Sequence, residues 1–342
     1  MSLTRDRSTV DDEMVIDLVD RPDAATDGSS PATGVDRRDA AFHQLVERLS
    51  RQSVAKHYDA FADIPWDDPD FAIDPDDRRF ELGTDDALGR TDWYRSQPAA
   101  VRARIGLHRY VSAMKIGLQF ENILKRGLLE HAFLLPNRDP TFRYAYHEVI
   151  EEAHHGLMFQ EFVNRSPFDV VGLRRYERAL SALIVKAGAV FPELFFLFVL
   201  GGEDPIDHVQ REALRSDREL HPLIEVIMRH HVTEEARHLS FARHYLKQAV
   251  PRLSWARRQV LSVATPLILG TMAQMMMKPP SSLIHRFAIP PEVVAAAYGS
   301  EAHAQDTVVA LRKVRRLARE LGLVNPMVTP LWRVLGVWDD DA

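Results

Sequence analysis

The sequence predicts an all-α protein with a four-helix bundle core and additional flanking helices. Apolar residues recur at three- and four-residue spacing through four long segments, the pattern of a helix with one buried face. No run of alternating apolar and polar residues indicates a strand. The four segments lie at about 102–133, 141–164, 174–202 and 213–249. The breaks between them hold Pro136, Pro140, Pro167, Gly172 and Pro205.

The segment before the bundle is less regular. Residues 1–40 are rich in Asp, Arg, Ser, Thr, Pro and Gly, so we expect a disordered or loosely docked tail. A helical pattern follows over residues 41–58. Residues 63–100 hold four prolines among many aspartates, which predicts an irregular connection.

Helices also follow the bundle. We expect an apolar helix at about 255–277, a short helix near Glu292 and a basic helix over 305–322. Nothing in this pattern indicates a second domain. The chain is therefore predicted to form a single helical domain over residues 41–342, with its core helices at about 102–249.

The composition narrows the range of functions. The net charge of −6 offers no basic surface for nucleic acid. The chain has no cysteine, which excludes disulfides, thiolate zinc sites, iron–sulfur clusters and cysteine nucleophiles. Any metal must therefore be held by oxygen and imidazole nitrogen. The lack of cysteine and of a signal-peptide pattern is typical of a cytoplasmic protein, and we expect that location.

Two apolar stretches approach the length of a membrane-spanning helix, residues 179–200 and 260–277. The first carries Lys186 and Glu193, and the second is interrupted by several polar residues and Pro266. Charges in the middle of a bilayer are costly. We therefore interpret both stretches as buried core helices and expect no membrane span.

A short internal echo is the most informative feature of the sequence. Residues 151–155 read Glu-Glu-Ala-His-His, and residues 234–238 read Glu-Glu-Ala-Arg-His. Aligning them gives two Glu-x-x-His steps, from Glu152 to His155 and from Glu235 to His238. Residues three apart lie on the same face of a helix, so one carboxylate and one imidazole can bind the same metal ion. Two such steps, with a glutamate from each of two further helices, form the centre of di-iron and di-manganese bundles.

The surroundings of the two steps favour a buried site. His231 precedes Glu235 by four residues, and this stripe lines up with apolar residues such as Met228 and Ala242. Glu152 and His155 line up in the same way with apolar residues of their own segment. Buried ionisable groups are costly unless they are paired or bind a metal. The alternative is two solvated helix faces stabilised by Glu–His and Glu–Arg pairs.

The other two segments each offer a carboxylate. Glu121 is flanked on its own face by apolar residues, where an acid without a cation is unfavourable. The alternative is a surface glutamate near Lys125. In the segment over 174–202 and just beyond it, the candidates are Glu193 and Glu203. Glu203 follows two glycines, which allow close approach of backbone or substrate, but spacing alone does not choose between the two acids.

These residues define a candidate two-metal site. Oxygen and imidazole ligands suit iron or manganese better than zinc. Glu152 and Glu235 are the candidates for bridging both ions, and His231 adds a third imidazole to one of them. Glu148, Glu151, Glu234 and Arg237 are the nearest residues that can orient the histidines, although we expect most of them to be solvated.

Four motifs resemble those of the 4-aminobenzoate N-oxygenase family of di-iron proteins, which have a ferritin-like fold. They are Phe-Glu-Asn-Ile-Leu-Lys around Glu121, Glu-Glu-Ala-His-His around Glu152, Gly-Gly-Glu-Asp-Pro around Glu203, and His-Val-Thr-Glu-Glu-Ala-Arg-His around Glu235. The resemblance covers roughly residues 100–250 and favours Glu203 over Glu193. It implies seven ligands to two iron ions: Glu121, Glu152, His155, Glu203, His231, Glu235 and His238. Manganese is the alternative metal.

The resemblance also implies an activity. The reduced site would react with O2 to form a peroxo intermediate, which oxygenates an arylamine nitrogen to hydroxylamine, nitroso or nitro products. An external electron donor and a small-molecule substrate are implied partners. A carboxylated arylamine would need an arginine, for which Arg126, Arg243 and the basic stretch 312–319 are the candidates.

Three other functions fit parts of the sequence. A di-iron hydroxylase or desaturase would act on another small apolar substrate, and a ferritin-like protein would oxidise iron without an organic substrate. The third is a helical scaffold without metal. For all of them a homodimer is expected, since an apolar helix such as 260–277 can pair across a twofold axis.

Overall fold

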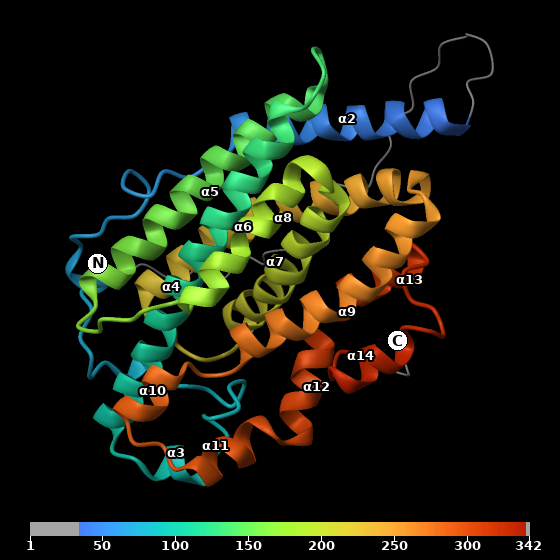
Figure 1. The fold of residues 1–342 in the computed structure, drawn as a ribbon. Coiled ribbons are helices and arrows are strands. Elements are labelled where there is room, and N and C mark those ends of the chain that lie inside the picture. Colours follow the sequence, from blue (N-terminus) through green and yellow to red (C-terminus); the bar gives the residue numbers. More distant parts are fainter. Residues whose placement is uncertain (1–33, 340–342) are drawn as a thin grey trace.

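A computed structural model describes residues 34–339, and within that range the chain forms helices and loops without a strand (Figure 1). The fold class predicted from the sequence is confirmed. Seven helices of the described chain are longest, and all but the first are joined to one another by short connections. They are α2 (Gly34–Ala55), α4 (Ala99–Phe133), α5 (Pro140–Arg165), α6 (Arg175–Val190), α7 (Pro192–Arg215), α8 (Pro222–Ala249) and α9 (Trp255–Met277).

The core is a ferritin-like bundle of α4, α5, α7 and α8. Helix α4 packs along α5, and α7 packs along α8, so the bundle consists of two helix pairs. Helix α6 lies against α4 and α7 from outside. The predicted segments 102–133 and 141–164 agree with α4 and α5 to within a few residues.

The boundaries of the other two bundle helices were predicted wrongly. The expected helix over 174–202 is two helices, because Pro192 disfavours helical backbone at the residue before it, and Phe191 leaves the helical region with φ −150° and ψ 65°. Pro205, expected in a break, lies inside α7. A proline within a helix costs roughly 3 kcal/mol. The packing of α7 against α4, α8 and α9 outweighs that cost. The helix expected over 213–249 begins only at Pro222, as α8.

Helix α2 lies across α5 and α8 at one end of the bundle (Figure 1). It begins at Gly34, so residues 34–40, which we had assigned to the tail, are helical. Asp39 accepts a hydrogen bond from Gln248 Nε2 at 2.8 Å and pairs with Arg252. The remaining residues of the predicted tail, 1–33, lie outside the described residues.

The connection from α2 to α4 is irregular, as predicted. It contains only the short helices η1 (Pro69–Phe71), η2 (Arg78–Phe80) and α3 (Asp92–Ser96). Buried side chains hold it on the bundle, among them Ile64, Phe80 and Tyr94. Tyr94 donates a hydrogen bond from its hydroxyl to the Arg102 carbonyl at 3.0 Å, which fixes the connection against the start of α4.

The chain after α9 returns along one side of the bundle. It forms α10 (Ser281–Arg286), α11 (Pro291–Tyr298), α12 (Glu301–Ala310), α13 (Arg312–Glu320) and α14 (Thr329–Val334). The predicted basic helix over 305–322 is therefore two helices that meet at Leu311. Arg315 within it is fully buried and donates to the carbonyl of Val308 at 3.0 Å.

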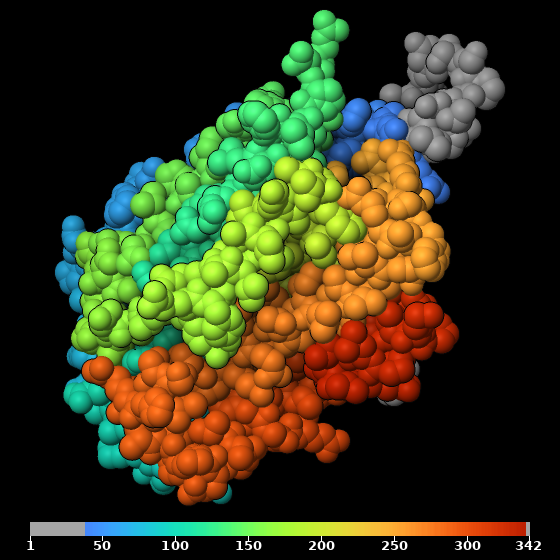
Figure 2. All heavy atoms as spheres, in the orientation of Figure 1, coloured from blue at the N-terminus to red at the C-terminus, as the bar shows by residue number. Residues whose placement is uncertain are grey.

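Of the two apolar stretches, 179–200 forms α6 and the first part of α7. The segment Trp255–Arg286 is long and apolar enough to cross a membrane by length and composition, and it is partly buried against α7 and α14. Helices α6 and α9 share one face of the molecule (Figure 2). On α9, Val260, Val263 and Leu267 are exposed at helical spacing. The homodimer stays a prediction for this face.

Candidate metal centre

The seven residues predicted as ligands lie together in the middle of the bundle. Glu121 comes from α4, Glu152 and His155 from α5, and Glu203 from α7, while α8 contributes the other three. Each side chain is at most 3% exposed. Their carboxylate oxygens and imidazole nitrogens form four groups of three residues that can hold a metal ion, and Glu148 joins one of these groups. Within each group the ligand atoms lie within 4.8 Å of one another.

The two Glu-x-x-His steps face each other across the interface between α5 and α8. Nδ1 of His155 lies 3.0 Å from Oε2 of Glu152 on its own helix and 3.6 Å from Oε1 of Glu235. Nδ1 of His238 lies 3.1 Å from Oε1 of Glu235 and 2.9 Å from Oε1 of Glu152. The two carboxylates therefore lie between the two imidazoles, which is the position that a bridging ligand needs.

His231 extends the cluster by one turn of α8. Its Nε2 lies 3.6 Å from Oε1 of Glu121 and 3.9 Å from Oε1 of Glu235. The imidazole rings of His231 and His155 have their centroids 4.7 Å apart. The third imidazole predicted from the sequence thus lies beside the glutamate of α4.

The structure separates the two acids that the sequence could not choose between. Glu203 groups with His231 and Glu235 in the cluster. Glu193 lies in the first turn of α7, 3.5 Å from Arg257, and belongs to none of the candidate groups. The glycine before Glu203 makes room for an aromatic ring, because a Cβ on Gly202 would lie 2.2 Å from the Phe120 ring.

Each histidine uses its other ring nitrogen to contact a buried acceptor. His155 Nε2 donates to Glu234 at 2.9 Å, and His238 Nε2 donates to Glu151 at 2.8 Å. His231 Nδ1 lies 2.9 Å from Oε1 of Gln210. Such partners hold an imidazole in one tautomer and direct its free nitrogen at the metal.

The expectation that most of the neighbouring charged residues are solvated was wrong. Glu148, Glu151 and Glu234 are at most 2% exposed, and Arg237 is also buried. Arg237 Nη2 lies 2.9 Å from Oε1 of Glu151 and 3.7 Å from Oε1 of Glu234, so one cation serves both acceptors. Gln210 was missed altogether, since it lies 21 residues from His231 and no motif connects them.

The buried carboxylates of the cluster show whether it fits a metal ion, because some of their oxygens have no partner in the protein. Glu121 Oε2, Glu148 Oε2 and Glu235 Oε2 are buried and make no hydrogen bond. Burial and the nearby Glu152 carboxylate raise the pKa of Glu121 well above its usual value and that of Glu235 to about 7. Burial raises the pKa of Glu148 to about 8. Acids in this arrangement repel one another when ionised, and a divalent cation removes that repulsion.

The histidines respond to the same charges. Burial opposes a charge on His155, but the adjacent Glu152 carboxylate raises its pKa to about 10. His231 differs, because burial and the neighbouring His155 lower its pKa well below the ordinary value. A neutral imidazole is the form that binds metal. The donor set therefore fits hard divalent ions such as iron and manganese.

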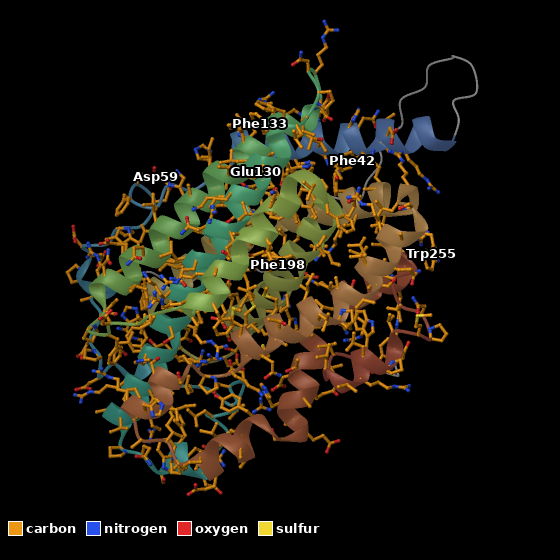
Figure 3. All side chains as sticks on the ribbon, in the orientation of Figure 1. Phe42, Asp59, Glu130, Phe133, Phe198 and Trp255 are labelled. Carbon is orange, nitrogen blue, oxygen red and sulfur yellow. The ribbon has the colours of Figure 1, made fainter. Side chains whose placement is uncertain are left out.

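Aromatic side chains cover the cluster. The Phe159 ring centroid lies 5.4 Å from that of His231 and 6.4 Å from that of His155. Phe120 stacks on Phe198 with centroids 5.0 Å apart. In Figure 3 the labelled Phe198 lies in the middle of the molecule, whereas Phe133 and Trp255 lie at its periphery. The side of the cluster that these rings cover is apolar, which strengthens electrostatic interactions beneath it.

The arginines considered for substrate binding lie elsewhere or have partners in the protein. Arg126 is exposed. Arg243 pairs with the buried Asp204. In the basic stretch 312–319, Arg315 pairs with Asp339 at 3.2 Å, and Arg312 and Arg316 are exposed.

Fold and cluster together define a ferritin-like helical bundle with a buried carboxylate–histidine centre, the class that contains the di-iron oxygenases. Residues 39–322 match the family model of the p-aminobenzoate N-oxygenase AurF. The chain therefore belongs to the AurF family, whose members are di-iron enzymes with oxygenase activity. The family predicted from the four motifs is confirmed.

Relatives extend over most of the chain. The uncharacterized protein Rv0885 of Mycobacterium tuberculosis is 39% identical over 297 residues, which cover 86% of this chain and 87% of the relative. The uncharacterized protein Mb0909 of Mycobacterium bovis matches with the same identity and coverage. No solved structure matches the chain significantly.

Proposed function

We propose that this protein is a di-iron oxygenase that N-oxygenates an arylamine. The observation that carries the proposal is the buried cluster of four glutamates and three histidines with unpartnered carboxylate oxygens. Membership of a family named for p-aminobenzoate N-oxygenase supports the reaction type. The seven ligands would be Glu121, Glu152, His155, Glu203, His231, Glu235 and His238.

Each ligand has a distinct role in this proposal. Glu152 and Glu235 lie between the two facing imidazoles and would bridge both ions. Glu121 and Glu203 would each bind from the outer side, since they come from α4 and α7. His231 would give one ion an additional neutral donor. The two ions would then differ in their ligands, which favours directed chemistry over simple iron oxidation.

Two bound irons would supply two electrons for the activation of O2, so that one oxygen atom enters the substrate and the other leaves as water with two protons. The protein's own contribution is to hold ligands and exclude water. Glu151, Glu234 and Gln210 keep the three imidazoles oriented. Phe159 and the neighbouring aromatic side chains form an apolar wall against which an aryl ring can pack. An external donor would return the site to its reduced state.

The first experiment compares wild type with His231→Ala. Metal content is measured after expression in iron-rich medium, and visible spectra are recorded when oxygen is admitted to the reduced protein. We expect two irons per chain and a spectral change that the substitution alters. His230→Ala is the matched control, because His230 stacks on Tyr58 with centroids 3.8 Å apart and belongs to no candidate group. Wild-type protein that contains no iron would contradict the proposal and favour a helical scaffold without metal.

Substrate class is tested separately. Reduced, iron-loaded protein is mixed with oxygen and a panel of arylamines with and without a ring carboxylate. Conversion of an arylamine to its hydroxylamine, nitroso or nitro product is the expected result. Fast iron oxidation with no organic product would instead favour a ferritin-like iron-oxidising protein, and oxidation only at carbon would favour a hydroxylase or desaturase.

A further inference from the structure

Helices α5 and α8 share a spacing of polar residues that extends one turn beyond the Glu-x-x-His step. On α8, His231, Glu235 and His238 stand at positions i, i+4 and i+7. On α5, the same spacing from Glu152 and His155 leads back to Glu148. Glu148 therefore takes the register on α5 that His231, a proposed metal ligand, takes on α8.

The contacts of Glu148 correspond to those of His231. A ligand atom of Glu148 lies within 4.8 Å of ligand atoms of Glu152 and His238, on its own helix and on the opposite one. His231 in turn lies 3.9 Å from Glu235 on its own helix, and its ring centroid lies 4.7 Å from that of His155 on the opposite one. The two acids that orient the histidines are also equivalent on the two helices. Glu151 on α5 accepts from His238 on α8, and Glu234 on α8 accepts from the histidine of α5.

Glu148 lacks the partners of an ordinary buried acid. It is 1% exposed, and its Oε2 makes no hydrogen bond. Tyr144 lies one turn earlier on α5, close enough for its hydroxyl to lower the pKa of Glu148, but no hydrogen bond of normal geometry joins the two side chains. Leaving a buried polar atom unpaired is unfavourable, because the atom has lost its hydrogen bonds to water. A cation bound beside Glu152 and His238 would satisfy the Glu148 carboxylate.

We propose that Glu148 is an eighth metal ligand, which binds the ion held by Glu152 and His238. This inference rests on the proposed di-iron function and adds a residue that the four motifs do not include as a ligand. Five carboxylates would then face the two ions: Glu121, Glu148, Glu152, Glu203 and Glu235. Four carboxylates balance two Fe²⁺ ions, and a fifth offsets part of the charge gained when both become Fe³⁺.

The test uses the full chain with Co²⁺ in place of iron, so that binding and ligand field are read without turnover. Co²⁺ is titrated against a competing chelator, and its visible absorption reports the ligands. Glu148→Gln keeps the shape of the side chain but removes its anionic oxygen. We expect wild type to bind two ions, and Glu148→Gln to weaken one of them by roughly tenfold or more with a changed absorption.

Two further variants separate ligation from packing. Glu148→His restores on α5 the donor pattern of α8, so two ions should bind with an absorption that differs from wild type. Glu161→Gln, on the same helix but paired with Arg165 at 2.7 Å, should behave as wild type. Circular dichroism checks the fold of each variant.

The outcomes distinguish this inference from the proposed function. Two ions in wild type, with unchanged affinity and absorption in Glu148→Gln, would overturn the eighth ligand and leave the seven-ligand centre standing. Failure of wild type to bind Co²⁺ or iron would overturn both. Loss of both ions in Glu148→Gln with a native circular dichroism spectrum would support ligation at a shared position.

Discussion

Nε2 of His238 donates a hydrogen bond to Oε2 of Glu151 at 2.8 Å, across the interface between α5 and α8. The reciprocal bond joins His155 on α5 to Glu234 on α8 at 2.9 Å. Each helix therefore orients the imidazole that the other helix presents. The first residue of each Glu-Glu pair holds a histidine, and the second lies between the two imidazoles.

This exchange predicts the effect of neutralising one orienting acid. Glu151→Gln keeps a hydrogen-bond acceptor but removes the charge that makes the imidazole of His238 a stronger ligand. We expect both ions still to bind, with one affinity reduced roughly tenfold, the lower end of the effect of such partners. Chelator competition measures this, and Glu161→Gln is the control. An unchanged affinity for both ions would show that Glu151 only neutralises Arg237.

Stability of the metal-free protein should fall as the pH rises from about 6.5 to 8, above the range in which buried histidines of lowered pKa such as His108 and His131 act in the opposite direction. Burial raises the pKa of Glu235 to about 7 and that of Glu148 to about 8, against about 4.5 in the unfolded chain. Between the unfolded and the folded values, the folded state holds protons that the unfolded state has released, so the free energy of unfolding falls with pH until the folded pKa values are passed. A loss on the order of 2 kcal/mol is expected.

Urea unfolding at several pH values checks this expectation. Glu148→Gln cannot ionise at that position, so its free energy of unfolding should depend less steeply on pH than that of wild type. Metal binding near pH 7 should also release protons, because the same acids must ionise to bind. Calorimetry in buffers of different ionisation enthalpy detects that release. A free energy of unfolding that rises from pH 6.5 to 8 would contradict the assignment.

The contact of α4 with α6 depends on two glycines. A Cβ on Gly188 would lie 2.1 Å from the backbone carbonyl oxygen of Gly127, which cannot move without shifting α4. Gly188→Ala should therefore lower the free energy of unfolding by about 1–3 kcal/mol, despite the better helix propensity of alanine. Gly156→Ala is the matched control, since its Cβ would meet only the side chains of Lys125 and Leu118. Denaturant titration of both variants measures the difference.

The spacing of residues along the sequence predicted which side chains share a face of one helix. It did not predict contacts between segments that are distant in the sequence. The spacing of Glu152, His155, Glu235 and His238 was visible because a helix fixes which residues share a face. Gln210 was not, since only the packing of α7 against α8 brings it to His231. The continuation of α7 through Pro205 was also unpredictable from local propensity, because tertiary packing outweighs one lost hydrogen bond.

The choice between Glu193 and Glu203 shows the same limit and yields a paired prediction. Both acids are buried on α7, but Glu193 lies near Arg257, whereas Glu203 groups with His231 and Glu235. Glu203→Gln should therefore lose one of two ions or bind it at least roughly tenfold more weakly, as loss of a ligand costs no less than loss of an orienting partner. Glu193→Gln should retain both ions, because it alters only a partly exposed ion pair worth about 0–1 kcal/mol. Metal content after gel filtration, with chelator competition, distinguishes the two variants. Equal metal loss in both would show that the assignment on α7 is wrong.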